Sequence, residues 1–266
     1  MKAIVLTCDK YHAFTDHMMH CYRHLWPENP FIFHVPYQQY PEHLKEKYGE
    51  KIRLIQSAPE IKSTMETLLK TTDAEEWVYW CMDDRYPVGL DTERVSAINR
   101  WVTGMDDEAV SGILFTYPMS KFTANYVDKH SAISDREKNR YVELIGYSHL
   151  WYHQFMRAKV LAHFTDHLPS VMSNAKQMDA IKNELTMAGH GKRYVAEKRA
   201  ASFGESTNRG KITLNCLNSM KEYGLDVPGT FSLLDKEIVT GSRKYERSVL
   251  YYNVRSLYRK VLGIGR

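Results

Sequence analysis

Short apolar runs alternate with helical patterns through the first 82 residues, and this alternation restricts the fold more than any other feature of the chain. The runs are almost wholly apolar, which is typical of strands covered by helices on both faces. The pattern predicts strands at 3–7, 31–35, 51–56 and 77–82, and helices at 12–25 and 60–70. We therefore expect an α/β fold with a mostly parallel sheet flanked by helices.

Further elements are predicted beyond residue 82. Apolar residues at helical spacing, from Val95 to Val102, follow an N-cap signal at Asp91-Thr92. Pro87 is expected to end the strand before it, and Pro169 to end a helix. The remaining pattern predicts strands at 109–116 and 141–147, a helix at 155–168, a polar surface segment at 125–140 and a loop at 196–211.

The composition excludes several classes of protein. The chain is 43% hydrophobic and 26% charged, and its net charge of +4 does not indicate a nucleic-acid partner. No run of 18 apolar residues suggests a membrane span, and the apolar run at the N-terminus is too short for a signal peptide. The four cysteines are widely spaced and form no C-x-x-C pair. This favours a cytoplasmic protein without a zinc site or disulfide framework.

The segment Trp77 to Pro87 carries the clearest functional signal. Its apolar strand ends in the carboxylates of Asp83 and Asp84. Ligands of open α/β sheets bind outside the carboxyl ends of the strands. Carboxylates without neighbouring His or Cys favour Mg²⁺ or Mn²⁺, ions that complete their shell with water and substrate phosphates. Alternatively, the two residues cap the next turn or pair with Arg85.

With this order of elements and the Met82-Asp83-Asp84 segment, the chain resembles the GT-A-fold glycosyltransferases, whose Asp-x-Asp motif binds the metal and diphosphate of a nucleotide-sugar. The resemblance covers about residues 1–215, although Met82 occupies the first acidic position of the full motif. It implies a metal-dependent transferase in which Asp84 binds Mn²⁺ or Mg²⁺ and Asp83 faces the ribose or a metal-bound water. The sugar acceptor implied is a glycan or a lipid-linked molecule in surface polysaccharide synthesis.

The same resemblance implies residues that bind the donor. Thr7, Asp9 and Lys10 follow the first strand, where the family holds the nucleobase, although Thr-Cys-Asp can equally cap the next helix. Further predictions are Ser57 and Lys62, at a strand end and the following helix start, and Ser148 and His149, which can bind sugar hydroxyls. A polar segment adds Arg209 and Lys211, which can close over the diphosphate, and Glu205 near the metal. Its alternative is an ordinary surface loop.

An inverting transfer needs a base for the acceptor hydroxyl. The family layout places that base on a helix over 174–184, with Asp179 as the first choice and Glu184 as the second. A retaining transfer needs neither residue.

We expect a catalytic domain over 1–242, with a nucleotide-binding half over about 1–120 and an acceptor half over about 121–242. The tail, 243–266, is basic, aromatic and amphipathic, which suits either an anionic membrane surface or packing against protein. The sequence is compatible with both a monomer and an oligomer. Two other functions are considered: a sugar nucleotidyltransferase, for which Thr7 to His12 lacks the expected glycines, and a non-catalytic glycan- or nucleotide-binding module.

Overall fold

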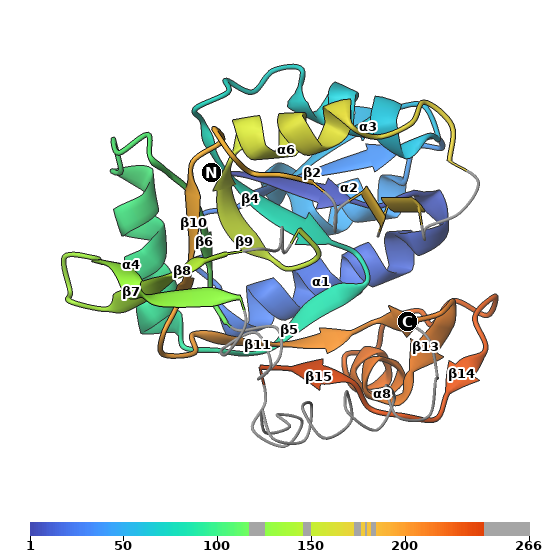
Figure 1. The fold of residues 1–266 in the computed structure, drawn as a ribbon. Coiled ribbons are helices and arrows are strands. Elements are labelled where there is room, and N and C mark those ends of the chain that lie inside the picture. The colour runs from blue at the N-terminus through green and yellow to red at the C-terminus, as the bar shows by residue number, and fades with distance from the viewer. Residues whose placement is uncertain (117–125, 146–149, 173–176, 179, 182–184, 242–266) are drawn as a thin grey trace, which may run out of the picture.

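A nine-stranded sheet runs through the centre of the computed structural model, in the order β3-β2-β1-β4-β9-β6-β10-β8-β7 (Figure 1). The structure describes residues 1–116, 126–145, 150–172, 177–178, 180–181 and 185–241. The strands are β1 Lys2–Leu6, β2 Ile32–Tyr37, β3 Ile52–Gln56, β4 Trp77–Met82, β6 Val110–Leu114, β7 Val127–Ser134, β8 Arg140–Leu144, β9 Gln154–Arg157 and β10 Lys192–Ala196. Only β9 and β8 run against the direction of the others. The predicted α/β fold with a mostly parallel sheet is confirmed.

Helices cover both faces of this sheet. They are α1 His12–Leu25, α2 Glu42–Tyr48, α3 Ile61–Leu69, α4 Thr92–Thr103, α6 Ala158–Asp166 and α8 Leu214–Glu222, with short 3-10 turns η1 Asp9–Tyr11 and η2 Gly49–Lys51. Helices α3 and α6 pack side by side on one face, and α1 lies on the other (Figure 1). The predicted cap of α4 is confirmed, because Asp91 Oδ1 accepts a hydrogen bond of 3.2 Å from the backbone N–H of Arg94.

Strand β4 shows why its sequence is apolar throughout. All six of its residues are buried. Val78, Trp80 and Met82 join the core beneath α3 and α6, whereas Tyr79 and Cys81 join the core on the α1 side. A strand buried on both faces has no position for a polar side chain, and the turn after Met82 is the first place where polar groups emerge.

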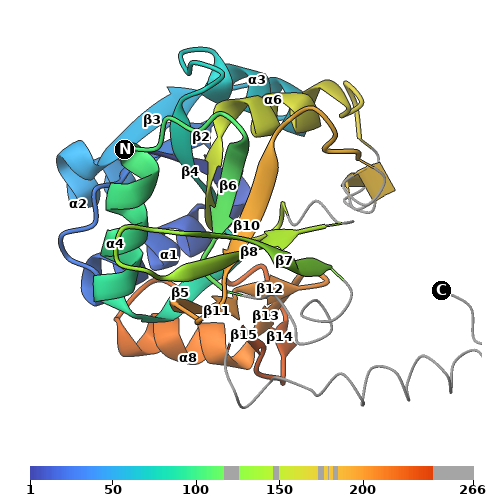
Figure 2. The same cartoon turned by 60° about the vertical axis from the view of Figure 1, so that its left-hand side comes forward.

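Two smaller sheets lie beside the central one, below it in Figure 2. One has the order β15-β11-β5 and the other β12-β13-β14. Their strands are β5 Arg85–Leu90, β11 Ala201–Glu205, β12 Thr207–Asn208, β13 Lys211–Thr213, β14 Leu233–Leu234 and β15 Val239–Thr240. Two predictions were therefore wrong: 196–211 is largely strand, and Pro87 lies inside β5. A proline is tolerated there because β5 is an edge strand and the β11 register shifts between Ser202 and Phe203, beside it.

Three other differences have identifiable causes. The segment predicted as a surface excursion, 125–140, contains β7, an edge strand whose residues are mostly solvent-accessible and therefore polar. The helix predicted from Phe155 begins only at Ala158, because the chain first forms β9, whose terminal Gln154 and Arg157 are buried polar residues. Helix α2 was not predicted, since its seven residues bury only Leu44 and Tyr48.

Candidate functional site

Asp83 and Asp84 form the turn that carries the chain from β4 into β5. The backbone N–H of Asp83 donates to Leu6 O at 3.3 Å, and the N–H of Ser206 donates to Asp84 O at 2.6 Å. The turn is thus fixed between the end of β1 and Ser206, which directly follows β11. Both carboxylates line a cavity of about 410 Å³, with Leu6, Thr7, Cys8, Tyr11, Ile61, Met82, Arg85, Trp151, Met178 and Thr207. The predicted residues Thr7, Asp83 and Asp84 are therefore brought together.

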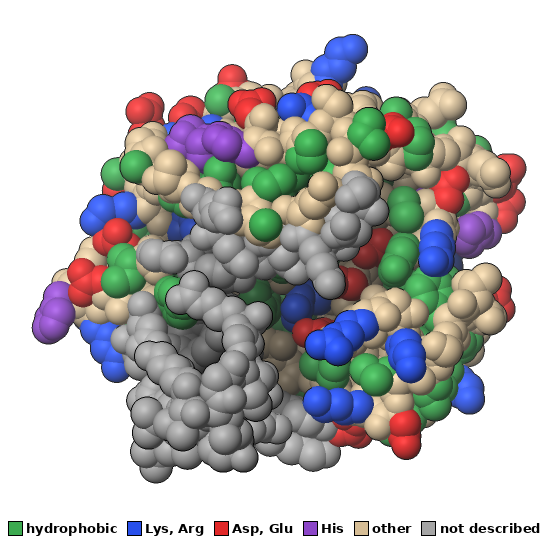
Figure 3. All heavy atoms as spheres, turned by 45° about the vertical axis from the view of Figure 1, so that its right-hand side comes forward, with side chains coloured by type: hydrophobic (Ala, Val, Ile, Leu, Met, Phe, Trp, Pro, Cys, Tyr) green, Lys and Arg blue, Asp and Glu red, His purple; other side chains and the backbone are tan. Residues whose placement is uncertain are grey.

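Negative charge is crowded in this cavity. Burial and the neighbouring Asp84 carboxylate raise the pKa of Asp83 well above its usual range, while a hydrogen bond from Thr7 opposes the shift. Thr7 is in turn held by Thr15 of α1, whose hydroxyl donates to Thr7 Oγ1 at 2.9 Å. Asp and Glu side chains are visible in a hollow of the surface in Figure 3. A cation bound here would relieve this repulsion.

A neutral histidine holds the backbone immediately before the turn. The ring of His153 is buried, and Nε2 lies 3.0 Å from Met82 O and 3.2 Å from Met82 N. Nδ1 lies 2.7 Å from the hydroxyl of Tyr22, which lies 2.6 Å from that of Tyr79. Burial lowers the pKa of His153 to about 3. Because β4 pairs with β9 only as far as Trp80 and Gln154, the imidazole replaces a strand partner for Met82.

Arg85 follows the turn and pairs with Glu205 across β5 and β11. Its Nη2 donates to Glu205 Oε1 at 3.1 Å, and its Cζ lies 4.5 Å from the centre of the Tyr152 ring. Burial alone would lower the pKa of this guanidinium, but Tyr152 and Glu205 raise it, so Arg85 stays a cation. Glu205 Oε2 accepts from Asn208 Nδ2 at 3.2 Å. The sequence analysis placed Glu205 near the metal. To bind a metal, Glu205 would have to give up its contacts with Arg85 and Asn208.

The acidic turn fits a divalent cation that is completed by a ligand. Within the described ranges, no three His, Cys, Asp or Glu side chains form a ready-made metal cluster. Mg²⁺ and Mn²⁺ are nevertheless often held by one or two carboxylates together with water and phosphate oxygens. The crowded pair of Asp83 and Asp84 satisfies that requirement.

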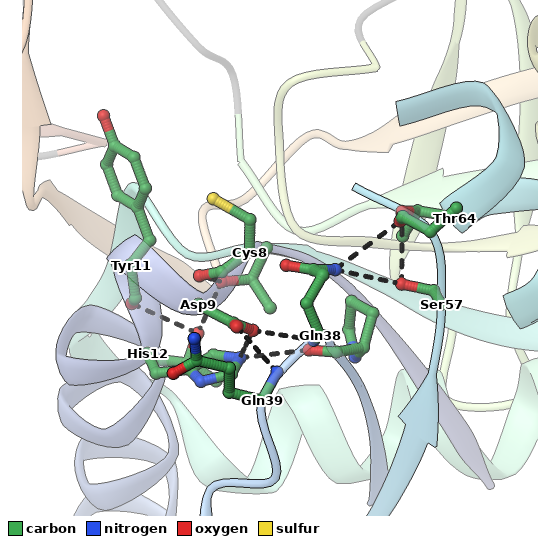
Figure 4. A network of polar contacts seen from close by, with 12 residues as sticks. Cys8, Asp9, Tyr11, His12, Gln38, Gln39, Ser57 and Thr64 are labelled. Atoms are coloured by element: carbon green, nitrogen blue, oxygen red, sulfur yellow. Dashed lines mark hydrogen bonds and ion pairs between the residues drawn. The ribbon is translucent and has the colours of Figure 1, made fainter. Parts of the chain in front are cut away.

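Asp9 and Ser57 lie in a polar network at the ends of β1, β2 and β3 (Figure 4). The Asp9 carboxylate accepts from the backbone N–H groups of Gln38 and Gln39, at 2.9 and 2.8 Å. Ser57 Oγ lies 3.3 Å from both Gln38 Nε2 and Thr64 Oγ1. In this structure both side chains hold the loop after β2, and their predicted contacts with a donor remain predictions.

The predicted cations lie around the cavity rather than inside it. Lys10 Nζ lies 5.1 Å from the centre of the Phe231 ring, and Lys62 Nζ donates to Asp166 O at 3.4 Å. Arg209 and Gly210 form the turn between β12 and β13, with φ of 53° and 74°, and Lys211 follows. This hairpin is next to the cavity, because Thr207 of β12 lines it. Ser148, His149, Asp179, Glu184 and the tail 243–266 lie outside the described residues.

Sequence reasoning missed several residues of the cavity. Cys8, Tyr11 and Thr207 line it and were not proposed as ligands. Arg85 was considered only as an ion-pair partner of the two aspartates, although a cation placed directly after two carboxylates is itself a signal. No pattern pointed to His153, because its contact with Met82 joins residues 71 positions apart.

The fold and the cavity define an α/β protein whose candidate ligand site is an acidic turn at the carboxyl edge of the sheet. No protein-family model and no curated protein sequence matches the chain. Solved structures similar to it include the 1–349 fragment of S. aureus TarS in complex with UDP-GlcNAc, at 15% identity and a TM-score of 0.49, over 79% of this chain and 59% of that one. The chain thus spans less than two thirds of that fragment.

Two further structures show the range of the similarity. The galactosyltransferase LgtC, in complex with donor and acceptor sugar analogues, is 11% identical with a TM-score of 0.43, over 91% of this chain and 87% of that one. The 4-diphosphocytidyl-2C-methyl-D-erythritol synthase of Anaerococcus prevotii is 12% identical with a TM-score of 0.39, over 84% and 95%. A likeness at this level concerns the general α/β layout and identifies no residue's role. Among the residues that the structure describes, no helix is long and apolar enough to cross a membrane.

Proposed function

We propose that the chain is a metal-dependent glycosyltransferase that moves a sugar from a nucleotide-diphosphate donor to a glycan or lipid-linked acceptor in surface polysaccharide synthesis. The observation that carries the proposal is the crowded carboxylate pair of Asp83 and Asp84 in a cavity at the carboxyl ends of β1 and β4. Such a pair can bind a divalent cation, and Mg²⁺ or Mn²⁺ held in this way usually coordinates phosphate oxygens as well. The polysaccharide setting comes from the resemblance of the sequence alone.

The residues take distinct roles in this proposal. Asp84 holds Mn²⁺ or Mg²⁺, which when bound stabilises the leaving diphosphate. Asp83, ordered by the hydrogen bond from Thr7, faces the ribose or a metal-bound water. The β12–β13 hairpin presents Arg209 and Lys211 beside the cavity, where they add positive charge near the diphosphate.

A thermal-shift screen tests this function. The protein is heated with UDP, GDP, CDP and their sugars, with and without Mn²⁺. A ligand present at one hundred times its Kd stabilises the folded state by about 2.7 kcal/mol. We expect at least one nucleotide to raise the Tm only when Mn²⁺ is present, and Asp84→Asn to abolish the rise. The control is Asp166→Asn, an exposed carboxylate at the end of α6, distant in sequence from the turn. Failure of every nucleotide to stabilise the protein would refute the proposal.

The proton acceptor in an inverting transfer is proposed to be Asp179, with Glu184 as the second choice. Met178, the neighbour of Asp179 in the chain, lines the cavity. Asp179→Asn should abolish transfer while preserving donor binding, since the base acts only on the acceptor hydroxyl. Full transfer by both Asp179→Asn and Glu184→Gln would show that neither residue removes the proton.

The tail is proposed to hold the enzyme at the inner face of a membrane. Removing residues 243–266 should reduce flotation with vesicles that contain anionic lipids, because each basic residue near such a surface contributes about 1 kcal/mol. Unchanged partitioning would favour packing of the tail on protein instead.

A further inference from the structure

Arg85 is a buried cation at the cavity that uses only part of its hydrogen-bonding capacity. Its side chain is 10% exposed and lines the cavity. A guanidinium carries five N–H donors. In the part of the chain that the structure describes, Nη2 donates to Glu205, whereas Nε and Nη1 are buried without a hydrogen-bond partner. Buried donors of a charged group are rarely left in this condition, so a further acceptor is expected.

A second buried arginine shows what a structural guanidinium looks like in this fold. The Arg157 side chain is 6% exposed. Its Nε donates to Val110 O at 3.1 Å and its Nη1 to Glu75 O at 2.7 Å, while Nη2 donates to both Met105 O and Asp107 O. Every nitrogen of Arg157 is therefore used by the protein itself. The Arg85 side chain is buried to a similar degree, but only one of its nitrogens, Nη2, donates a hydrogen bond to the described part of the protein.

The contact between Arg85 and Glu205 is also incomplete as an ion pair. Arginine and a carboxylate usually pair through two parallel hydrogen bonds. Here Glu205 Oε1 meets Arg85, whereas Oε2 meets Asn208 Nδ2 at 3.2 Å. The carboxylate is divided between two partners, and the planar fork of the guanidinium remains available to a second oxyanion.

Resting on the proposed function, we propose that Arg85 binds a phosphate oxygen of the donor's diphosphate. The guanidinium follows Asp84 directly in the chain and lines the same cavity, so a diphosphate bound to a cation on Asp84 lies within its reach. Phosphate presents the oxyanion geometry that an arginine fork matches, which a lysine does not. Because Glu205 occupies only Nη2, the unpartnered Nε and Nη1 can donate to a phosphate oxygen while Glu205 keeps its contacts with Nη2 and Asn208.

Inorganic pyrophosphate is the probe, because it tests the anion site without depending on the nucleobase. Calorimetric titrations compare the wild-type chain with Arg85→Lys and Arg157→Lys, each in Mn²⁺ and in EDTA, and circular dichroism confirms that each variant is folded. We expect Arg85→Lys to weaken pyrophosphate binding about tenfold or more in both conditions, the range for hydrogen bonds to charged groups. Arg157→Lys should lower the Tm and leave pyrophosphate affinity within about twofold of wild type, because it lies outside the cavity lining.

A second variant covers the case in which Arg85→Lys fails to fold. Glu205→Gln removes a negative charge beside the guanidinium, so pyrophosphate affinity in EDTA should stay level or rise. A fall in that affinity, or an Arg85→Lys variant that binds as wild type does, would overturn the role of Arg85. If wild type binds a nucleotide diphosphate with Mn²⁺ and Arg85→Lys binds it equally well, the proposed function stands and this inference fails. If wild type binds neither pyrophosphate nor any nucleotide, both fail together.

Discussion

Replacing His153 tests how the fold fixes the acidic turn. In His153→Phe the ring volume is kept, but the imidazole Nε2, which lies 3.2 Å from Met82 N and 3.0 Å from Met82 O, is removed. A neutral Nε2 is either a donor or an acceptor, so one hydrogen bond to Met82 is lost. Each buried polar group left unsatisfied costs about 1–3 kcal/mol. With one hydrogen bond to Met82 lost, we expect a loss of about 1–3 kcal/mol. Tyr22 keeps a partner, since its hydroxyl still meets that of Tyr79 at 2.6 Å.

His153→Gln is the matched control. A glutamine amide offers both a donor and an acceptor, so it can restore the hydrogen bond with Met82 and should cost less than His153→Phe. Urea denaturation at pH 7 measures the difference, and the slope m should be alike in the two variants. Because Met82 precedes Asp83, His153→Phe should also weaken Mn²⁺-dependent nucleotide binding more than His153→Gln does. If His153→Phe were as stable as wild type, the imidazole would not be holding this strand end.

Three further outcomes follow from burial and charge. Burial lowers the pKa of both His17 and His153 to about 3, so the unfolded chain takes up protons at these sites below pH 6.5 while the folded one does not. These two sites contribute a fall in stability of roughly 3 kcal/mol per pH unit between pH 6 and 4, to which His34 adds and which the raised pKa of Asp83 opposes. Urea titrations should show stability falling with pH over this range, and a flat profile would refute the reasoning. Asp83→Asn should raise the Tm of the ligand-free protein at pH 7. That gain should shrink toward pH 4, since the raised pKa leaves Asp83 protonated there; an unchanged Tm would contradict the crowding of charge. Gly204→Ala should cost about 1–3 kcal/mol, because its Cβ would lie 2.5 Å from Tyr86 Cζ, whereas Gly89→Ala, with nothing within 4 Å, should cost far less; equal costs would show that the site can relax.

The first half of the fold could be predicted because its elements carry strong local patterns. Helix α1 and strand β4 have the predicted bounds, and the cap of α4 is where Asp91 indicated it. These segments bury one face of a helix or a whole strand, and such burial produces a hydrophobic pattern that can be recognised within a short stretch of sequence.

The second half is held by pairing between distant segments, which leaves a weaker local pattern. Strand β9 lies between β4 and β6 although its outer residues are Gln154 and Arg157, and Arg157 is tolerated there only because backbone carbonyls take up its donors. Strand β11 pairs with β5 across more than one hundred residues of chain. Its register, with Gly204 opposite Tyr86, cannot be read from the five residues Ala-Ser-Phe-Gly-Glu alone.

The candidate site divides in the same way. The Asp83-Asp84 turn could be located from sequence, since a buried strand that ends in two carboxylates must expose them at the edge of the sheet. What surrounds the turn could not be located, because each neighbour comes from a different part of the chain: Thr7 from directly after β1, His153 from before β9, and Glu205 from β11.

The surroundings change the chemistry that the turn alone would suggest. Two carboxylates by themselves indicate a cation site, and any divalent metal ion could neutralise their charge. The fold adds a permanent guanidinium one residue later and keeps the nearby His153 neutral, so the cavity holds charges of both signs close together. A bare cation would be drawn to Asp83 and Asp84 but opposed by Arg85, and a bare anion would meet the reverse. A cation with a phosphate attached can interact with the two aspartates through the metal and with Arg85 through the phosphate. Under the proposed function, the arrangement therefore favours a metal–phosphate ligand over either ion alone, as a transferase that binds its metal and its donor together would require.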